Sequence, residues 1–326
     1  MESAKKAGYR TPPEWARVDG IWMSWPVADQ LWESVPRQEL ESVFADLVAL
    51  ISRFAEVRLC VRENQRAHVE EQFAAAGAQN YQIFGISTDD VWCRDHGATF
   101  LKHKDTGTPA VIDWIYNGWG GKFSHQLDSQ VARRMAESWG LRRFQVPLVC
   151  EGGAIEVDGE GLCMTTESVL LNPNRNPNLK KGKVEQLLIE SLGVDKVLWL
   201  KGGLPHDDTD GHADMVARFT KPGHVLAVEK STETLGENAE RLEAAGLEVR
   251  YLPDAGEVTE GVSGSYANFL IVNGAVIVPQ YGKSTDEKAL EIIRAEFPSH
   301  EVVGFDCSVL GLEGGGIHCL TQGQFA

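Results

Sequence analysis

The sequence predicts an α/β protein in which five similar units form a ring. One order of elements recurs along the chain: a strand, a polar or glycine-rich segment, two strands and a helix. The polar segments carry landmark residues at intervals of about 50 to 60 residues, a period typical of repeat architectures. The last unit stops early, and N-terminal segments are able to complete it. The landmarks are, in order, Asp95, Glu151, Asp214, Asn268 and Cys319.

Four elements precede the first complete unit. Residues 21–25 (IWMSW) are expected to form a short strand that ends at Pro26. A helix is predicted over 37–54, because apolar residues recur there at three- and four-residue steps on one face. A strand at 57–61 and a helix at 64–76 follow.

Four complete units come next. The first has strands at 81–86, 98–102 and 110–116 and a helix near 128–139. The second has strands at 143–149, 154–157 and 162–166 and a helix at 183–192. The third has strands at 196–200, 215–219 and 225–229 and a helix at 235–244. The fourth has a strand at 248–252, two strands joined at Asn273-Gly274, which favours a type I′ hairpin, and a helix at 286–297.

The fifth unit has only a strand at 301–305 and the segment GLEGGGIHC. Its missing strand and helix are expected to come from 21–25 and 37–54. The chain ends would then pair, close the ring and leave no open sheet edge at the seam. We therefore expect residues 1–326 to form one domain whose polar segments line one pocket. A doubly wound sheet stays open as an alternative.

Charge and composition restrict the partners. The net charge is −16 at pH 7, which disfavours binding to nucleic-acid phosphates and would attract small cations. No apolar run fits a membrane span or a secretion signal, so we expect a cytoplasmic protein with no membrane partner. The six cysteines lack CxxC or zinc-finger spacing, as in reduced cytosolic proteins. The sequence leaves homo-oligomerisation open.

A cysteine near the C-terminus follows three consecutive glycines. The glycines at 314–316 precede His318 and Cys319. Glycines suit a place where the main chain approaches another group closely or adopts a positive φ. Backbone N–H groups beside Cys319 would favour its thiolate, which is the nucleophilic form. The alternative is a cysteine that only packs in the core.

The predicted pocket would bring together a nucleophile, an imidazole and three carboxylates. These are Cys319, His212, Asp95, Asp214 and Glu151. Carboxylates that face one cavity indicate a planar, positively charged ligand, and a guanidinium fits because it binds carboxylates through paired N–H···O bonds. Its central carbon would lie within reach of Cys319, with His212 placed to move protons.

Other ligand classes have weaker support. The GWGGK segment lacks P-loop spacing, and GLEGGG lacks the dinucleotide fingerprint. HDDTDG fails as an EF-hand, because Ala217 occupies the position where calcium needs a carboxylate. A hard cation held by His212, Asp214 and the neighbouring acids stays open, as does a merely solvated acidic loop. Neither alternative explains Cys319.

Six segments carry further motifs. They are WCRD (92–95), EGGAIEVDGEG (151–161), NRNP (174–177), DDTDGHAD (207–214), YANF (266–269) and GGGIHCLTQ (314–322). Together and in this order they resemble the agmatine deiminase family, also called the Porphyromonas-type peptidylarginine deiminases. The resemblance extends from GYRTPPEW to the C-terminus. It implies the pentein fold of the guanidine-modifying superfamily, a five-bladed α/β-propeller with fivefold pseudosymmetry, as a single catalytic domain.

The resemblance also implies residue roles. Cys319 attacks the guanidinium carbon, while Asp95 and Asp214 hold the guanidinium nitrogens. Glu151 supports these carboxylates, and His212 protonates departing ammonia and then deprotonates a water. The other residues expected to line the substrate pocket are Trp92, Gly315 and Gly316.

The implied reaction is a hydrolysis of a C–N bond. It converts agmatine, a small guanidinium dication, to N-carbamoylputrescine and ammonia through an amidino-cysteine intermediate. The resemblance places this step in putrescine and polyamine biosynthesis, with no metal and no organic cofactor.

The sequence departs from the family pattern in three places. EWARVDG lacks an expected histidine, Ala98 replaces an expected proline, and TQGQ replaces TQQ. The first departure bears on the substrate, because the N-terminal segment is expected to help hold its far end. A deiminase of arginine or peptidyl-arginine is the alternative with the same chemistry, with Arg94 or Lys122 binding the substrate carboxylate. A guanidinium- or polyamine-binding protein without turnover is the alternative from a different class.

Overall fold

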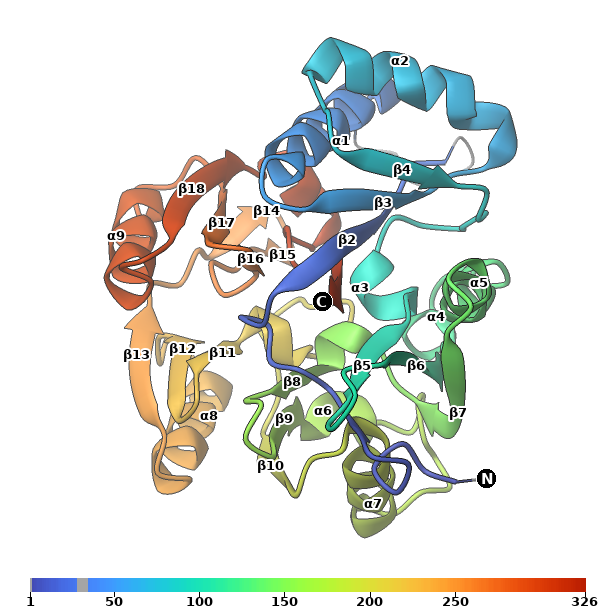
Figure 1. Cartoon of the computed structure of the whole chain (residues 1–326). Coiled ribbons are helices and arrows are strands. Elements are labelled where there is room, and N and C mark those ends of the chain that lie inside the picture. The colour runs from blue at the N-terminus through green and yellow to red at the C-terminus, as the bar shows by residue number, and fades with distance from the viewer. Residues whose placement is uncertain (1, 28–34) are drawn as a thin grey trace.

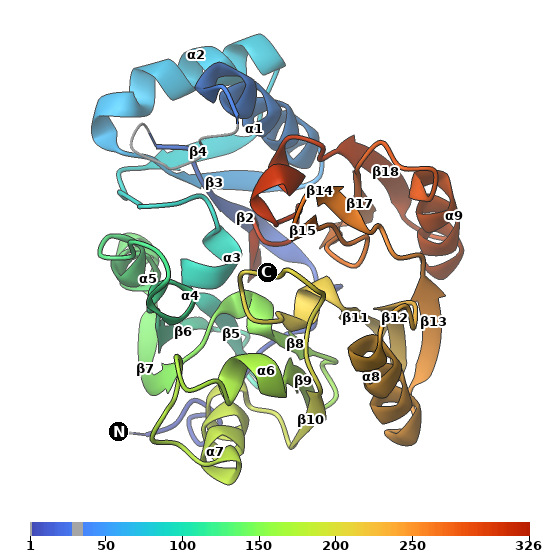
Figure 2. The ribbon, with the colours of Figure 1, turned by 180° about the vertical axis from the view of Figure 1, so that it is seen from behind.

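The computed structural model describes residues 2–27 and 35–326. These residues form five sheets of three or four strands and one two-stranded sheet. Figures 1 and 2 show the five larger sheets arranged around the C-terminal strand, with helices on the outside. The predicted mixed α/β architecture is therefore observed, as separate sheets and not as the single sheet of the doubly wound alternative.

Each of the five larger sheets has the same core order. A short strand pairs antiparallel with a middle strand, and the middle strand pairs parallel with a strand that follows a helix. The parallel pairing follows because a crossover through a helix returns the chain in the same direction. Four of the five larger sheets thus take two strands from one unit of the sequence and the next strand from the unit that follows.

Two sheets have four strands. The first contains β19 (Gln322–Phe325), β2 (Val18–Ser24), β3 (Glu56–Cys60) and β4 (Tyr81–Phe84), with α1 (Arg37–Ser52), η1 (Glu63–Gln65) and α2 (Arg66–Ala76). The second contains β1 (Tyr9–Arg10), β5 (Thr99–His103), β6 (Pro109–Ile115) and β7 (Arg142–Val149), with α3 (Cys93–His96), α4 (Gly118–Gly121), η2 (Asp128–Gln130) and α5 (Val131–Ser138).

The remaining sheets are smaller. The third contains β8 (Ile155–Val157), β9 (Leu162–Thr166) and β10 (Lys196–Leu200), with η3 (Gly152–Ala154), α6 (Glu167–Leu170) and α7 (Lys181–Leu192). The fourth contains β11 (Ala217–Lys221), β12 (His224–Val228) and β13 (Glu248–Leu252), with η4 (Ala213–Met215) and α8 (Glu233–Ala244). The fifth contains β16 (Leu270–Val272), β17 (Ala275–Gln280) and β18 (Glu301–Asp306), with α9 (Asp286–Glu296) and η5 (Leu310–Glu313). The two-stranded sheet contains β14 (Glu257–Thr259) and β15 (Val262–Ser263).

The two ends of the chain meet in the first sheet. Strand β19 pairs antiparallel with β2, so that Gln322 lies opposite Trp22. The indole Nε1 of Trp22 donates a hydrogen bond to Gln324 Oε1 at 2.9 Å. In each of the other large sheets, the short antiparallel strand comes just before the middle strand in the sequence. In this sheet, β19 from the C-terminus takes that place beside β2.

Some boundaries differ from the predicted ones. The predicted strand at 215–219 begins instead with the turn η4, and the predicted helix at 128–139 divides into η2 and α5. The pair β14–β15 was not predicted, because strands of two or three residues are too short for a clear alternating pattern. Asn273 and Gly274 have φ of 34° and 88°, as the predicted type I′ hairpin requires.

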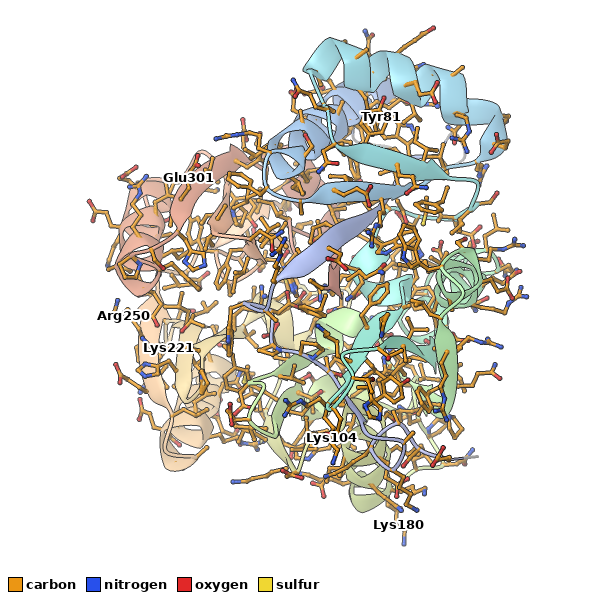
Figure 3. The ribbon with its side chains drawn as sticks, in the orientation of Figure 1. Tyr81, Lys104, Lys180, Lys221, Arg250 and Glu301 are labelled. Carbon is orange, nitrogen blue, oxygen red and sulfur yellow. The ribbon has the colours of Figure 1, made fainter. Side chains whose placement is uncertain are left out.

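The core lies between the sheets and the outer helices. Strands β12, β16 and β17 consist almost entirely of buried apolar residues, as expected for strands covered on both faces. Exposed charged side chains such as Lys180, Lys221 and Arg250 lie at the outer rim (Figure 3). The polar residues of interest here lie on the inside.

Each landmark residue lies in a short segment just before the antiparallel strand of a sheet. Asp95 is in α3 before β5, Glu151 precedes η3 and β8, and Asp214 is in η4 before β11. Asn268 precedes β16, and Cys319 precedes β19. Turn η3 contacts both α3 and η4. The repeated position therefore brings polar residues from different sheets toward one place.

Candidate active site

Cys319 lies buried between Asn268 and Asp214. Asn268 Oδ1 accepts a hydrogen bond from the Cys319 main-chain N–H, and Asn268 Nδ2 donates to Cys319 Sγ, both at 3.1 Å. The Sγ atom lies 3.7 Å from Asp214 Oδ2. The thiol is therefore held by an amide on one side and faces a carboxylate on the other.

Asp95 is fixed by two donors. Trp119 Nε1 donates to its Oδ2 at 2.9 Å, and the Gly153 main-chain N–H donates to its Oδ1 at 3.0 Å. His212 Nδ1 lies 3.6 Å from the same Oδ1. These contacts orient the Asp95 carboxylate beside the imidazole of His212.

Glu151 joins three of the sequence motifs. Its Oε1 accepts a hydrogen bond from Arg175 Nε at 2.7 Å, and its Oε2 lies 3.9 Å from His212 Nε2. Arg175 Nη1 also donates to Asp210 Oδ2 at 2.6 Å. The EGG, NRNP and DDTDGHAD motifs are thus linked through one buried arginine.

The imidazole of His212 is fully buried among carboxylates. Burial by itself would lower its pKa, but the charges of Asp95, Glu151 and Asp214 outweigh this effect and raise the pKa of His212 to about 9. His212 is therefore an imidazolium at neutral pH, which is the state a proton donor needs.

Asp214 remains ionised although it is buried. Burial favours its neutral form, but the hydrogen bond from His318 and the positive charges of His212 and Arg218 lower its pKa below the ordinary value. His318 Nδ1 lies 2.7 Å from Asp214 Oδ2. A carboxylate thus persists beside Cys319.

The expectation that the glycine segment favours a Cys319 thiolate is wrong for the unliganded protein. Burial and the carboxylates of Asp214 and Asp95 raise the pKa of the Cys319 thiol well above its usual range. Hydrogen bonds from the Gly316 backbone and from Asn268 act in the opposite direction but are outweighed. Cys319 is therefore a neutral thiol in this environment.

A cavity of about 280 Å³ opens beside Cys319. Trp92, Asp95 and Trp119 line it together with Gly315. Its remaining described lining is mostly acidic or apolar, namely Asp90, Phe123, His206, Asp207, Asp208, Thr209, Val262, Leu312, Glu313 and Gly314. The pocket is therefore suited to a positively charged ligand.

At three positions around this pocket, only glycine fits, because a Cβ atom would clash with a neighbouring side chain. A Cβ at Gly315 would lie 2.0 Å from the Trp92 ring, and one at Gly316 would lie 2.7 Å from Asn268 Oδ1. A Cβ at Gly153 would lie 2.6 Å from His212 Nδ1. The close backbone approach predicted for the glycine segment is thus observed, with Trp92 and Asn268 as the neighbours.

Comparison with known proteins now assigns the family. The profile of the Porphyromonas-type peptidyl-arginine deiminases matches residues 10–324. The chain belongs to this family. Its sequence is 36% identical to an agmatine deiminase of Pseudomonas aeruginosa, over 97% of this chain and 95% of that protein. It is 34% identical to a putative agmatine deiminase of a Marinomonas species, over 98% of this chain and 95% of that protein.

A solved structure agrees with this assignment. The agmatine deiminase of Enterococcus faecalis superposes with a TM-score of 0.91 at 31% sequence identity. The superposition covers 99% of this chain and 98% of that one. The family member described here therefore has the same α/β fold as that enzyme.

Four residues of the site were not predicted from the sequence to be functional. Asn268 was recognised only as a landmark of the repeat, which was the signal that could have marked it as a site residue. Trp119 and Arg175 lie in GWGGK and NRNP, segments whose partners no local pattern reveals. His318 precedes Cys319 in sequence, but its bond to Asp214 joins residues that are far apart in the chain.

The N-terminal segment of this deiminase-family protein lies elsewhere than expected. Of the described residues that line the cavity beside Cys319, none comes from the segment EWARVDG. Its Glu14 instead lies behind the site, 3.5 Å from His318 Nε2. The missing family histidine of this segment therefore has no direct bearing on the described pocket.

Two properties of the described residues bear on ligands and location. Within residues 2–27 and 35–326, no three His, Cys, Asp or Glu side chains are grouped so as to hold a metal ion. None of the helices in the same ranges has the length and apolar character that crossing a bilayer requires.

Proposed function

We propose that this protein is an agmatine deiminase, which hydrolyses the guanidinium of agmatine to N-carbamoylputrescine and ammonia. The observation that carries this proposal is a buried nucleophile beside carboxylates. Cys319 Sγ lies 3.7 Å from Asp214 Oδ2 in a pocket that Asp95 also lines. Relatives named agmatine deiminase match nearly the whole chain and support the same substrate.

Two buried carboxylate oxygens are available to a guanidinium. Asp214 Oδ1 and Glu151 Oε2 accept no hydrogen bond within the described chain. A buried acceptor without a donor is costly, and a guanidinium supplies N–H donors in a planar fork that fits carboxylates. Asp95 and Asp214 would hold the guanidinium nitrogens, and Glu151 would support them.

Substrate binding would activate the nucleophile. The carboxylates that raise the pKa of Cys319 also attract the guanidinium, whose positive charge offsets theirs and lowers the thiol pKa. The thiol then releases its proton to solvent, since His212 is already protonated, and Sγ adds to the guanidinium carbon to form a tetrahedral adduct. The cationic substrate is thus required to form the thiolate that attacks it.

Proton transfer by His212 completes both halves of the reaction. The His212 imidazolium donates a proton to one nitrogen of the adduct, the C–N bond breaks, and ammonia leaves an amidino-cysteine. Neutral His212 then takes a proton from a water whose oxygen adds to the same carbon. Cleavage of the C–S bond releases the ureido product and regenerates the cysteine.

The charge of the pocket favours agmatine over arginine. Agmatine lacks the carboxylate of arginine, so it carries two positive charges and no negative one, and the described lining residues include Asp90, Asp208 and Glu313 but no arginine or lysine. Arg94 is buried and paired with Glu14 at 2.7 Å, and Lys122 donates to Asp210 at 2.8 Å. Neither basic residue is free to bind a substrate carboxylate.

Turnover assays test this choice. Purified protein is incubated with agmatine, free arginine or a peptide with a C-terminal arginine, and ureido product and ammonia are measured. We expect agmatine to be turned over with the highest kcat/KM. Turnover of only the peptide would contradict the proposed substrate, and binding of agmatine without ammonia release would indicate a non-catalytic binding protein.

Two substitutions and a chelator distinguish the cysteine mechanism from a metal-dependent hydrolysis. Cys319→Ser and His212→Ala should each lower kcat by at least about 10³-fold, because each removes a reacting group. A chelator should leave the rate unchanged, since the proposed chemistry uses no metal and no cofactor. Loss of activity with the chelator would favour a metal-dependent hydrolase.

We infer further that the five larger sheets form a five-bladed α/β-propeller with fivefold pseudosymmetry. The common strand order of the sheets and the β2–β19 pairing support this inference. Residues 1–326 would then form a single catalytic domain closed by its two ends. Six buried free thiols fit a cytoplasmic protein.

A further inference from the structure

We propose that His318 is a positioning residue, which holds Asp214 in place beside Cys319 and whose own main chain is held by Arg94, the partner of Glu14. This inference rests on the proposed deiminase function and adds a residue to its machinery. His318 does not line the pocket beside Cys319. It acts through Asp214, which faces the nucleophile.

The imidazole of His318 lies between two carboxylates and donates to one of them. Its Nδ1 lies 2.7 Å from Asp214 Oδ2, and its Nε2 lies 3.5 Å from Glu14 Oε1. The side chains of His318 and Asp214 are fully buried. Because the same Asp214 oxygen lies 3.7 Å from Cys319 Sγ, the imidazole fixes the carboxylate at the position that faces the thiol.

The two carboxylate oxygens of Asp214 differ in their hydrogen-bond partners. Oδ2 accepts from His318, while Oδ1 has no donor within the described chain. Oδ1 is therefore the oxygen that stays available to a guanidinium. Without His318 the carboxylate could rotate, and this difference would be lost.

The surrounding charges set the tautomer of His318. Asp214 is ionised and can only accept, so Nδ1 must carry the proton. Burial, Arg218 and Arg94 lower the pKa of His318, and these effects outweigh Glu14 and Asp214, which act in the opposite direction. His318 is thus a neutral donor, which holds the Asp214 charge without cancelling it.

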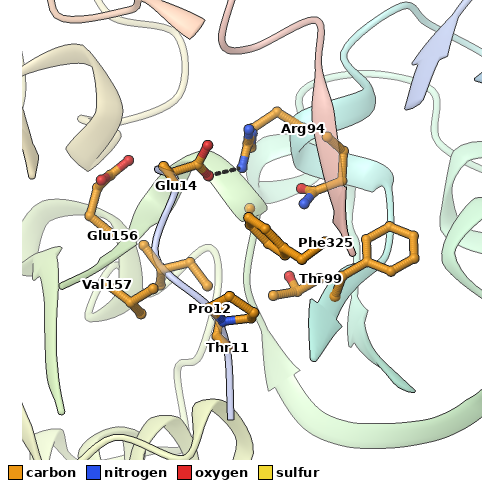
Figure 4. A pocket seen from close by; sticks show the side chains of 12 residues that line it. Thr11, Pro12, Glu14, Arg94, Thr99, Glu156, Val157 and Phe325 are labelled. Atoms are coloured by element: carbon orange, nitrogen blue, oxygen red, sulfur yellow. Dashed lines mark hydrogen bonds and ion pairs between the residues drawn. The ribbon is translucent and has the colours of Figure 1, made fainter. Parts of the chain in front are cut away.

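Glu14 and Arg94 hold the main chain at His318. Arg94 Nη1 donates to Glu14 Oε1 at 2.7 Å, and Arg94 Nε donates to the His318 carbonyl at 3.4 Å. Figure 4 shows Glu14 directed toward Arg94, with Glu156 on the other side of Glu14. These groups line a small cavity of about 30 Å³ that is distinct from the pocket beside Cys319.

A substitution series tests the role of His318. His318→Leu removes the donor, whereas His318→Asn keeps an N–H at the position of Nδ1. We expect His318→Leu to lower kcat/KM for agmatine by about 10²-fold, as for a misplaced catalytic group. His318→Asn should retain activity within about tenfold of the wild type.

The pH profile separates positioning from a merely structural role. Without its donor, buried Asp214 should have a raised pKa and take up a proton as the pH falls. The ratio of kcat/KM in His318→Leu to that of the wild type should therefore decline from pH 8 to pH 6. An unchanged ratio across this range, or equal loss in His318→Asn, would overturn the proposal.

If the His318→Leu protein does not fold, two further variants test the proposal. Glu14→Gln removes the ion pair with Arg94 and should lower kcat/KM by about tenfold, as outer partners of a site do. Glu156→Gln is the matched control, because Glu156 lies on the other side of Glu14 and pairs with Arg218 instead of Arg94. Equal activity of these two variants would overturn the role of Glu14.

Alkylation tests His318 independently of turnover. Protonation of Asp214 in His318→Leu removes a charge that raises the Cys319 pKa, so iodoacetamide at pH 7 should react faster than in His318→Asn. Equal rates in the two folded variants would overturn the proposal. If the wild type turns over no guanidine substrate, the proposed function is refuted. The alkylation test of His318 remains valid in that case.

Discussion

The two side chains at the centre of the site differ in one proton from a resting thiolate–imidazolium pair, because Cys319 is a neutral thiol while His212 is charged. The same carboxylates keep Cys319 a thiol and His212 an imidazolium at neutral pH. A negative environment disfavours a thiolate and favours a cation, so both effects have one cause. The nucleophile is therefore expected to depend on the charge of whatever enters the pocket.

Alkylation of Cys319 should depend strongly on the charge of the reagent. We expect a cationic haloacetamidine to react at pH 7 at least about tenfold faster than a neutral haloacetamide of similar size, because the carboxylates attract the cation and its charge lowers the thiol pKa. Rates are measured by mass spectrometry, with Cys319→Ser to assign the site. Equal rates for both reagents would contradict a carboxylate-lined thiol.

The raised pKa of His212 makes stability dependent on pH. The folded pKa of about 9 exceeds the ordinary value of 6.5, so the imidazolium stabilises the fold fully below pH 6.5 and less as the pH rises through 9. The change is on the order of 3 kcal/mol between these limits. Denaturant unfolding of wild type and His212→Gln from pH 6 to pH 10 measures it, and parallel curves would disprove the assignment.

At the scale of elements, short turns and close glycine contacts position the site. The landmark residues occupy equivalent turns before short antiparallel strands, which explains why the sequence spacing singles out four of the five residues that we propose take part in the reaction. The glycine segment that ends before Cys319 is packed against Trp92 and Asn268. The site therefore depends on backbone approach as much as on its side chains.

A pair of glycine substitutions tests this dependence. Gly315→Ala should lower kcat/KM by about 10²-fold and destabilise the fold by about 1–3 kcal/mol, because its Cβ would lie 2.0 Å from the Trp92 ring. Gly236→Ala, in helix α8, meets no atom within 4 Å and should stabilise the fold by about 1 kcal/mol. Similar effects of the two changes on activity and melting temperature would refute the packing argument.

At the scale of the whole molecule, the packing of separate sheets brings Asp95 and Cys319 into one pocket. The recurring elements and their spacing were readable from the sequence, because each unit repeats a local pattern of strands and helix. The contacts of Trp119, Arg175 and His318 were not readable. They depend on how one sheet sits against the next, which no local pattern encodes.

The protonation of Cys319 could not be read from the sequence either. The glycine segment favours a thiolate locally, but carboxylates from distant units determine the thiol pKa. The seam between the chain ends, by contrast, had a signal in the truncated last unit. Strand β19 pairs with β2 at that seam, three residues after the nucleophile.

The central claim is that Cys319 forms a covalent bond to the carbon of a guanidinium held by carboxylates from other sheets. The most direct measurement is mass spectrometry of protein quenched in acid during turnover of agmatine, followed by peptide mapping. The account predicts an amidino adduct on the peptide that contains Cys319, absent in Cys319→Ser. Formation of ureido product without any adduct, and with full activity in Cys319→Ser, would contradict it.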